Sequence, residues 1–142
     1  MNPFDRAVLA ERAIVLRRHL SRVASKLPPT AEDFAKSSDA SDSVILHLWQ
    51  ATQIVIDLAV AACVALEAGT PQSYADAFRR LQGVGVIDEA LADRLVRAAG
   101  FRNVVAHAYE SLDLLRIHHA ATTGPSDLLA FVAALDRAAQ PE

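Results

Sequence analysis

The sequence predicts an all-α protein, an up-and-down bundle of four to five helices built as one domain over residues 1–142. Alanine, the strongest helix former, makes up about a fifth of the chain, against only 5 glycines and 6 prolines. Apolar residues recur every three or four positions in each long segment, which is the period of a helix with one buried face. No segment alternates apolar and polar residues in the manner of a half-buried strand.

The expected helices begin at capping residues and end at proline or glycine. The first spans Pro3 to Leu27 and ends at the two prolines that follow it. Thr30 is expected to cap a short turn from Ala31 to Lys36. The polar segment from Ser37 to Ser43 then predicts a mobile connection.

The second long helix is expected to start at Asp42 or Ser43, to run to about Ala68 and to stop at Gly69. It is apolar nearly all round, which predicts the central, buried helix of the bundle. Its polar exceptions recur every three or four positions and are expected to share one stripe: His47, Gln50, Gln53 and Asp57. Two interpretations of this stripe stay open, a solvent-facing edge or the hydrogen-bonded lining of a wet cavity or interface.

The C-terminal half of the chain predicts further helices. Ser73 is expected to cap a helix from Tyr74 to Gln82, and Asp88 a longer one from Glu89 to about His107. Two shorter helices, 111–121 and 127–139, are expected on either side of a break at 123–125, because proline cannot donate the helical hydrogen bond.

The composition limits the possible classes of function. Hydrophobic residues make up 52% of the chain and charged residues 22%, which excludes an intrinsically disordered protein. The single cysteine, Cys63, excludes a disulfide scaffold and is expected to be a buried thiol. The formal net charge of −3 argues against non-specific binding of nucleic acid, so any RNA contact has to come from a local cluster of basic residues.

The sequence also predicts a cytoplasmic protein. Several charges interrupt the first 22 residues, so no signal-peptide core is expected. The longest unbroken apolar run, Leu58 to Leu66, is far shorter than the roughly 18 residues of a membrane span. So many apolar residues in a small domain with few aromatic ones indicate that a partner covers part of its surface.

One segment carries residues suited to phosphodiester chemistry, namely Arg102-Asn103-Val104-Val105-Ala106-His107-Ala108-Tyr109. On a helix Arg102 and His107 lie about 140° apart, and their long side chains can converge on a ligand across the helix end. The imidazole can move the proton of a ribose 2′-hydroxyl, and the guanidinium can stabilise charge on the phosphoryl oxygens without a metal. The spacing by itself is equally compatible with purely structural roles.

The histidines do not predict a metal site. The chain contains five of them: His19, His47, His107, His118 and His119. None forms a pair with another histidine or a cysteine at the helical spacing that suits zinc. They are expected at the surface.

The motif resembles a known signature. Arg102-x4-His107 followed by Tyr109 is similar to the Arg-x4-6-His motif of the HEPN superfamily, and the form Arg-Asn-x3-His-x-Tyr resembles the HepT-like toxins of HEPN/MNT toxin–antitoxin pairs. The resemblance extends over nearly the whole chain, through Gln53, Ile56-Asp57-Leu58, Pro71-Gln72-Ser73-Tyr74, Ala77-Phe78, Leu81, Gly85-Val86-Ile87, Asp113 and Asp127-Leu128.

This resemblance implies a helical bundle that forms a homodimer, with two copies of the motif in one cleft. It implies a metal-independent endoribonuclease without a cofactor, in which Arg102 and His107 are catalytic and Asn103 supports them. Tyr109 matches the tyrosine that a partner MNT-type minimal nucleotidyltransferase modifies with AMP. The added charge and bulk would block RNA. Because the chain is acidic overall, Arg94 or Arg97 is expected to add positive charge to the cleft.

Two other functions stay open at the level of sequence. The chain could be a non-catalytic HEPN module that dimerises and serves as the AMP acceptor of its partner, in which case it would not cut RNA. It could also be the helical half of a split nucleotidyltransferase, in which case the isolated chain would bind ATP. A likeness of fold cannot choose among these.

Overall fold

A computed structural model describes residues 5–107 and 113–139, except for the side chains at positions 103, 104, 106 and 107. Within this part of the chain there are six helices and no strand: α1 (Arg6–Lys26), α2 (Ala31–Lys36), α3 (Ser38–Ala65), α4 (Tyr74–Gly83), α5 (Glu89–His107) and α6 (Leu114–Ala138). The predicted all-α class is confirmed. The predicted number of four to five helices is too low, because the short α2 is a helix in its own right.

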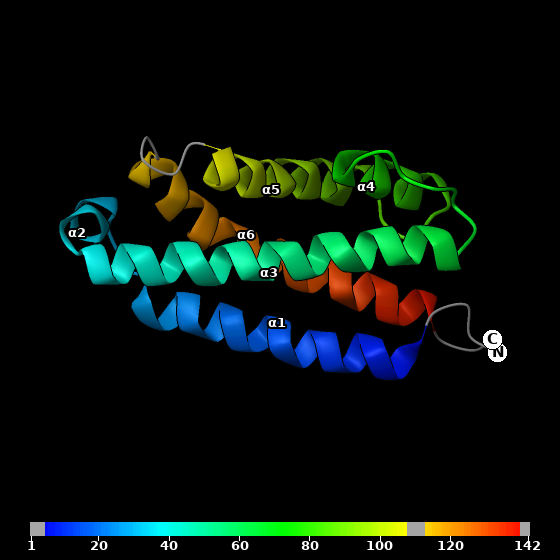
Figure 1. The fold of residues 1–142 in the computed structure, drawn as a ribbon, viewed down its shortest axis with the longest axis horizontal. Helices are drawn as coiled ribbons and strands as arrows, with labels where there is room; N and C mark the ends of the chain where they lie inside the picture. The colour runs from blue at the N-terminus through cyan, green and yellow to red at the C-terminus, as the bar shows by residue number, and fades with distance from the viewer. Residues whose placement is uncertain (1–4, 108–112, 140–142) are drawn as a thin grey trace.

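The four long helices run alternately in opposite directions. Figure 1 shows α1 and α3 side by side and antiparallel, α5 along the opposite edge of the bundle, and α6 crossing obliquely behind α3. The short α2 lies at the end of the bundle where α3 begins, and α4 packs against both α3 and α5. The last turns of α5 and the first turns of α6 lie at the same end as α2, which places the Arg102 segment there.

Local capping signals fix the starts of four helices. Asp5 accepts the backbone N–H of Ala7 at 2.9 Å and begins α1, and Thr30 accepts that of Asp33 at 3.1 Å and begins α2. Ser73 caps α4 and Asp88 caps α5, at donor–acceptor distances of 3.0 and 2.8 Å. The starts of α2, α4 and α5 agree with the sequence-based predictions. The first helix was predicted to start at Pro3, but it begins at Arg6 because Asp5 is its extended N-cap.

The start of α3 was predicted wrongly. The helix begins at Ser38, and its cap is Ser37, whose Oγ accepts the N–H of Ala40 at 3.3 Å. Residues 37–43 are therefore the cap and first turns of α3 rather than a connection. The one buried polar residue of this segment, Ser41, is satisfied within the helix, since it donates its hydroxyl to the carbonyl of Ser38 at 3.1 Å. At its other end α3 stops at Ala65, three residues before the predicted end.

The predicted break in the C-terminal segment is also wrong, because α6 is one helix with Pro125 inside it. Hydroxyl groups just before the proline bond to helix carbonyls: Thr122 to His118 at 2.8 Å and Thr123 to His119 at 3.0 Å. The buried face continues on both sides of the proline, through Ile117, Ala121, Leu128, Phe131, Val132 and Leu135. The free energy gained by packing this continuous face outweighs the cost of the hydrogen bond that Pro125 cannot donate.

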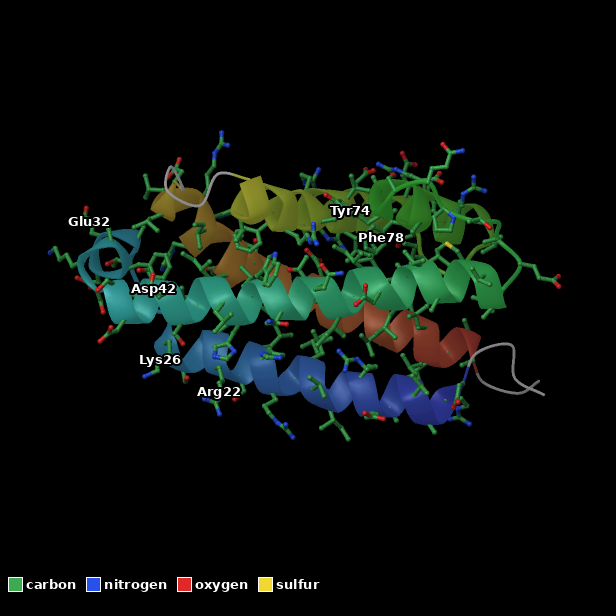
Figure 2. All side chains as sticks on the ribbon, viewed as in Figure 1. Arg22, Lys26, Glu32, Asp42, Tyr74 and Phe78 are labelled. Carbon is green, nitrogen blue, oxygen red and sulfur yellow. The ribbon has the colours of Figure 1, made fainter. Side chains whose placement is uncertain are left out.

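Two hydrophobic clusters hold the bundle together. The larger one joins α1, α3, α4, α5 and α6, and its buried rings Phe78 and Phe131 meet edge to face with centroids 5.5 Å apart. Figure 2 shows Phe78 between α4 and α3. The smaller one fills the end of the bundle around α2 and is built on the fully buried Phe34. Trp49 and Phe101 pack on its border, so this cluster supports the Arg102 segment.

The core position of α3 explains its composition. By length and composition alone it is the one helix in the described ranges that could cross a membrane, with a mean hydropathy of 1.6 over its most apolar window. More than half of that window, 56%, is buried against the other helices. Cys63 lies in this buried face as predicted, where its Sγ donates to the carbonyl of Ala77 at 3.3 Å and burial raises the pKa of the thiol.

Three histidines are not the surface residues that the sequence predicted. His19 of α1 and His47 of α3 are partly buried, and their Nδ1 atoms lie 3.0 Å apart. One ring therefore donates and the other accepts. His118 bonds to the carbonyl of Pro28 at 2.8 Å and packs against Phe34. His119 is exposed, as expected.

We expect the contact between His19 and His47 to make the fold sensitive to mild acid. Burial lowers the pKa of both imidazoles, and for His19 the neighbouring His47, Arg12, Arg18 and Arg22 lower it further. The unfolded chain, with ordinary histidine pKa values of about 6.5, then binds more protons than the folded chain, so stability is lost as the pH falls through and below that value. The urea midpoint should drop between pH 7.5 and pH 5.5.

The matched control for this prediction is an exposed histidine. The combined change His19→Gln and His47→Gln should reduce the drop, whereas His119→Gln should leave it unchanged. An equal drop in both variants would show that other groups cause the acid sensitivity.

Candidate functional site

The sequence-predicted motif lies on the last turns of α5. Arg102 is partly buried there, and His107 is the last residue of the helix. The side chains of Asn103 and His107 lie outside the described part of the structure, and so does the whole of Tyr109. The geometry of the site therefore rests on Arg102 and its surroundings.

Arg102 is held by a short chain of hydrogen bonds from α3. Its Nε donates to Gln53 Oε1 at 2.7 Å, and Gln53 Nε2 donates to Asp57 Oδ1 at 2.9 Å. This fixes one edge of the guanidinium plane. Neither Nη atom is hydrogen-bonded to a described residue, so the outer edge of the fork can donate two parallel bonds to an anion such as a phosphate.

The tryptophan one turn before Gln53 completes the support. The Arg102 Cζ atom lies 6.0 Å from the centroid of the Trp49 ring, at the limit of a cation–π contact. The indole Nε1 is buried without a hydrogen-bond partner among the described residues, so Trp49 contributes the face of its ring. Together Trp49 and Gln53 hold the Arg102 guanidinium from two sides, which limits the orientations that its side chain can adopt.

The polar stripe predicted on this helix divides into two parts. Gln53 bonds to Arg102 of α5 and to the exposed Asp57, so this part of the stripe is hydrogen-bonded and fits the solvent-facing edge, which was one of the two open interpretations. His47 does not share that stripe, because it turns to His19 on α1. Sequence reasoning noticed Gln53 without assigning it a role, and it missed Trp49. The signals were a glutamine on a buried helix and the chain's single tryptophan four residues before it.

The basic residues expected near Arg102 behave differently from each other. Arg94 Nε pairs with Asp127 Oδ1 of α6 at 2.8 Å, so its charge is largely balanced. Arg97 is exposed, and it forms no ion pair with any residue in the described ranges. Arg97, rather than Arg94, is therefore the second cation that an anionic ligand would meet.

The described residues hold no group of three or more histidine, cysteine, aspartate or glutamate side chains that could bind a metal ion. The His19–His47 pair has cations around it, since Arg12, Arg18 and Arg22 all act on it. Such surroundings disfavour a second positive charge. Among the residues that the structure describes, Arg102 is the candidate for binding an anion, because its two Nη groups donate to none of them.

The fold and this arginine site define a helical bundle of the HEPN class. The family model described as Ribonuclease HepT-like matches residues 16–135, so the chain belongs to the HepT-like ribonuclease family. The resemblance inferred from the Arg102–Tyr109 motif is thereby confirmed at the level of the family.

Individual relatives agree with this assignment. The chain is 28% identical over 112 residues to a protein of Shewanella oneidensis named mRNA nuclease HepT, covering 79% of this chain and 84% of that protein. A solved structure of a tri-AMPylated Shewanella oneidensis HEPN toxin in complex with an MNT antitoxin matches with a TM-score of 0.82 at 25% identity, over 92% of this chain and 97% of that one. A toxin–antitoxin structure with AMP-PNP, 24% identical and covered over 98% of its chain, has a TM-score of 0.84 over 92% of this chain and supports the fold alone.

Proposed function

We propose that this chain is the toxin of a HEPN/MNT toxin–antitoxin pair, a metal-independent endoribonuclease that a partner nucleotidyltransferase neutralises by adenylylating Tyr109. The observation that carries the proposal is the Arg102 guanidinium, whose Nε is bonded to Gln53 and whose Nη atoms have no hydrogen-bond partner among the described residues, in a chain of the HepT-like ribonuclease family. The relative named mRNA nuclease and the tri-AMPylated relative bound to an MNT antitoxin support the two halves of this proposal.

The reaction follows from the chemistry of the motif. The ribose 2′-oxygen attacks the adjacent phosphorus while the bond to the 5′-oxygen breaks, which leaves a 2′,3′-cyclic phosphate and a 5′-hydroxyl. His107 takes the proton of the 2′-hydroxyl, and Arg102 stabilises the charge that grows on the phosphoryl oxygens. Asn103 supports this pair through hydrogen bonds. In a homodimer the partner's His107 supplies the proton to the leaving oxygen.

The direct test is RNA cleavage by the purified chain with excess EDTA. Cleavage should continue, and the products should carry a cyclic phosphate that resists phosphatase until acid opens it. Loss of cleavage in EDTA would contradict the metal-independent mechanism. A chain that accepts AMP from its partner but never cuts RNA would instead be the non-catalytic binding module.

A homodimer would bring two motifs together, and α3 offers a surface for it. Three exposed apolar side chains share the outward stripe of Gln53 and Asp57: Leu46, Val60 and Val64, with exposed fractions of 50%, 39% and 62%. With Gln50 these positions follow the alternating four- and three-residue spacing of a helix–helix seam. Because Arg102 is bonded to this stripe, a second copy docked on it would place its own Arg102 nearby.

We expect Val60→Glu to weaken the homodimer and cleavage together. The new carboxylate would lie one turn after Asp57, on the face proposed to meet its own copy. Val84→Glu changes a valine outside the stripe whose exposed fraction is 49%, and it is the control. Sedimentation gives the mass, and the rate of RNA cleavage gives the activity. A dimer that is unchanged in Val60→Glu would place the interface elsewhere.

Gln53 acts as a positioning residue for Arg102 in this proposal. Gln53→Leu keeps the volume but removes both hydrogen bonds, and we expect kcat to fall about 10- to 100-fold with little change in KM. Gln53→Glu restores an acceptor for Arg102 Nε and should recover part of the loss. Gln82→Leu on α4, which loses a bond from Arg79 rather than from Arg102, is the control. Equal losses in Gln82→Leu and Gln53→Leu would mean that the effect is only structural.

The proposed function implies a cellular location for the toxin and its antitoxin. We place toxin and antitoxin in the cytoplasm, where the RNA substrate and the ATP that the partner nucleotidyltransferase needs are both present.

A further inference from the structure

A cavity of about 380 Å³ opens between α3, α5 and α6 beside the Arg102 site. Its walls are mainly apolar, formed by Leu48, Ala98, Phe101 and Leu128. It borders the same stretch of the α3–α5 contact as Arg102, because the cavity residues Leu48 and Phe101 directly precede Trp49 and Arg102 in the sequence. A volume of this size is within the range of small-ligand sites.

The rim of the cavity carries basic side chains. Arg97 lies on it without an ion pair to any described residue, and the exposed His119 lies opposite on α6. Arg94 also lines it but is paired with Asp127. An apolar interior with a cation at its mouth that no described residue pairs with is complementary to a flat apolar group that carries a negative charge at one edge.

Besides the arginine and histidine side chains that line it, the cavity offers hydrogen-bond acceptors. Thr52 and Thr123 already donate their hydroxyls to the carbonyls of Leu48 and His119, at 2.8 and 3.0 Å, so only their oxygen lone pairs are left for a ligand. The Asp127 carboxylate is an acceptor too. These acceptors suit a ligand with an amino group on its ring.

We propose that this cavity binds one base of the RNA strand, with the ring against Phe101 and the flanking phosphate on Arg97. The inference rests on the proposed ribonuclease function and extends it to substrate selection. Unpaired RNA bases are commonly recognised by stacking on aromatic side chains, with basic residues on the backbone. The acceptors favour adenine or cytosine, whose exocyclic amino groups donate, over uracil, which lacks one.

The test uses single-stranded octamers that cannot be cleaved because every 2′-oxygen is methylated. Fluorescence anisotropy compares octamers of adenosine, of cytidine and of uridine with an abasic octamer of the same charge. The wild-type chain should bind the adenosine and cytidine octamers about tenfold more tightly than the abasic one, and the uridine octamer less tightly than either.

Two kinds of variant separate the base from the phosphate. Ala98→Leu fills the cavity and Phe101→Leu removes the ring, so both should abolish the preference for bases while binding of the abasic octamer stays. Two substitutions guard against a single variant that misfolds. Arg97→Ala should weaken all octamers alike and flatten the salt dependence by about 0.7 in the log–log slope. Arg17→Ala on α1, which does not pack against α5, is the charge-matched control.

The outcomes decide the inference independently of cleavage. The cavity proposal would be overturned if the wild-type chain bound all octamers equally, or if Ala98→Leu and Phe101→Leu kept the preference for octamers with bases. Either result would leave the ribonuclease proposal intact. The same preference in a chain that cannot cut RNA would support the cavity and overturn the ribonuclease. Free AMP or CMP should compete only weakly, because each offers one phosphate. Tight binding of a free nucleotide with no binding of octamers would identify a nucleotide pocket and overturn the RNA site.

Discussion

His107→Ala should reduce RNA cleavage by about 10²- to 10⁴-fold, because a positioned general base contributes that much to rate. Arg102→Ala should cost about 10²- to 10³-fold or more, as expected when one donor to a developing phosphoryl charge is lost. Arg102→Lys keeps the charge but loses the Nε bond to Gln53 and the two-pronged fork, so it should recover activity only in part. The measurement is the initial rate of cleavage of a labelled RNA in EDTA.

The control for these variants is again Arg17→Ala, which removes an exposed arginine from the far helix α1. Binding of a methylated, non-cleavable RNA should fall little in His107→Ala, since the imidazole acts on the reacting proton rather than on the ground state. Full activity in both Arg102→Ala and His107→Ala would disprove the assignment of the motif.

Tyr109→Phe should abolish neutralisation by the partner while leaving cleavage active. The phenol oxygen is the proposed acceptor of AMP, and phenylalanine keeps the ring but offers no nucleophile. Incubation with the cognate nucleotidyltransferase and ATP should raise the intact mass of the wild-type chain by one or more AMP units and stop cleavage, because the added phosphates repel RNA at Arg102. The variant should show no added mass and should stay active.

The chain contains its own control for this experiment. Tyr74, on α4, is the only other tyrosine, so Tyr74→Phe should be modified and inactivated like the wild type. Added AMP on the Tyr109→Phe chain would place the acceptor at another residue.

Features set by neighbouring residues could be predicted from the sequence, whereas features set by distant contacts could not. The caps at Thr30, Ser73 and Asp88 act over three residues, so they could be read directly and are confirmed. The prediction of a break at Pro125 was wrong because the free-energy cost of a proline inside a helix is outweighed by the packing of the same helix against distant parts of the chain. The predicted start of α3 was wrong because a serine-rich segment can form either a loop or a capped first turn, and the sequence alone does not distinguish the two.

The candidate site likewise has a local part that the sequence predicted and a distant part that it did not. The spacing of Arg102, His107 and Tyr109 lies within one segment, so its resemblance to a family was visible in the sequence, and the family is confirmed. The partner of Arg102 was not visible, because Gln53 is 49 residues away. The roles of Arg102, Asn103, His107 and Tyr109 in the reaction remain predictions, which the variants above test.

The sequence by itself determined that this protein is a helical bundle, where three of its helices begin, and which short motif resembles the signature of its family, because periodicity, capping and motif spacing are local. Only the tertiary structure decided that Gln53 and Trp49 hold Arg102, that His19 meets His47 across 28 residues, and that α6 continues through Pro125. The periodicity of a helix tells which of its faces is buried. It does not tell which neighbour covers that face, because this depends on the rotation and height at which the helices pack.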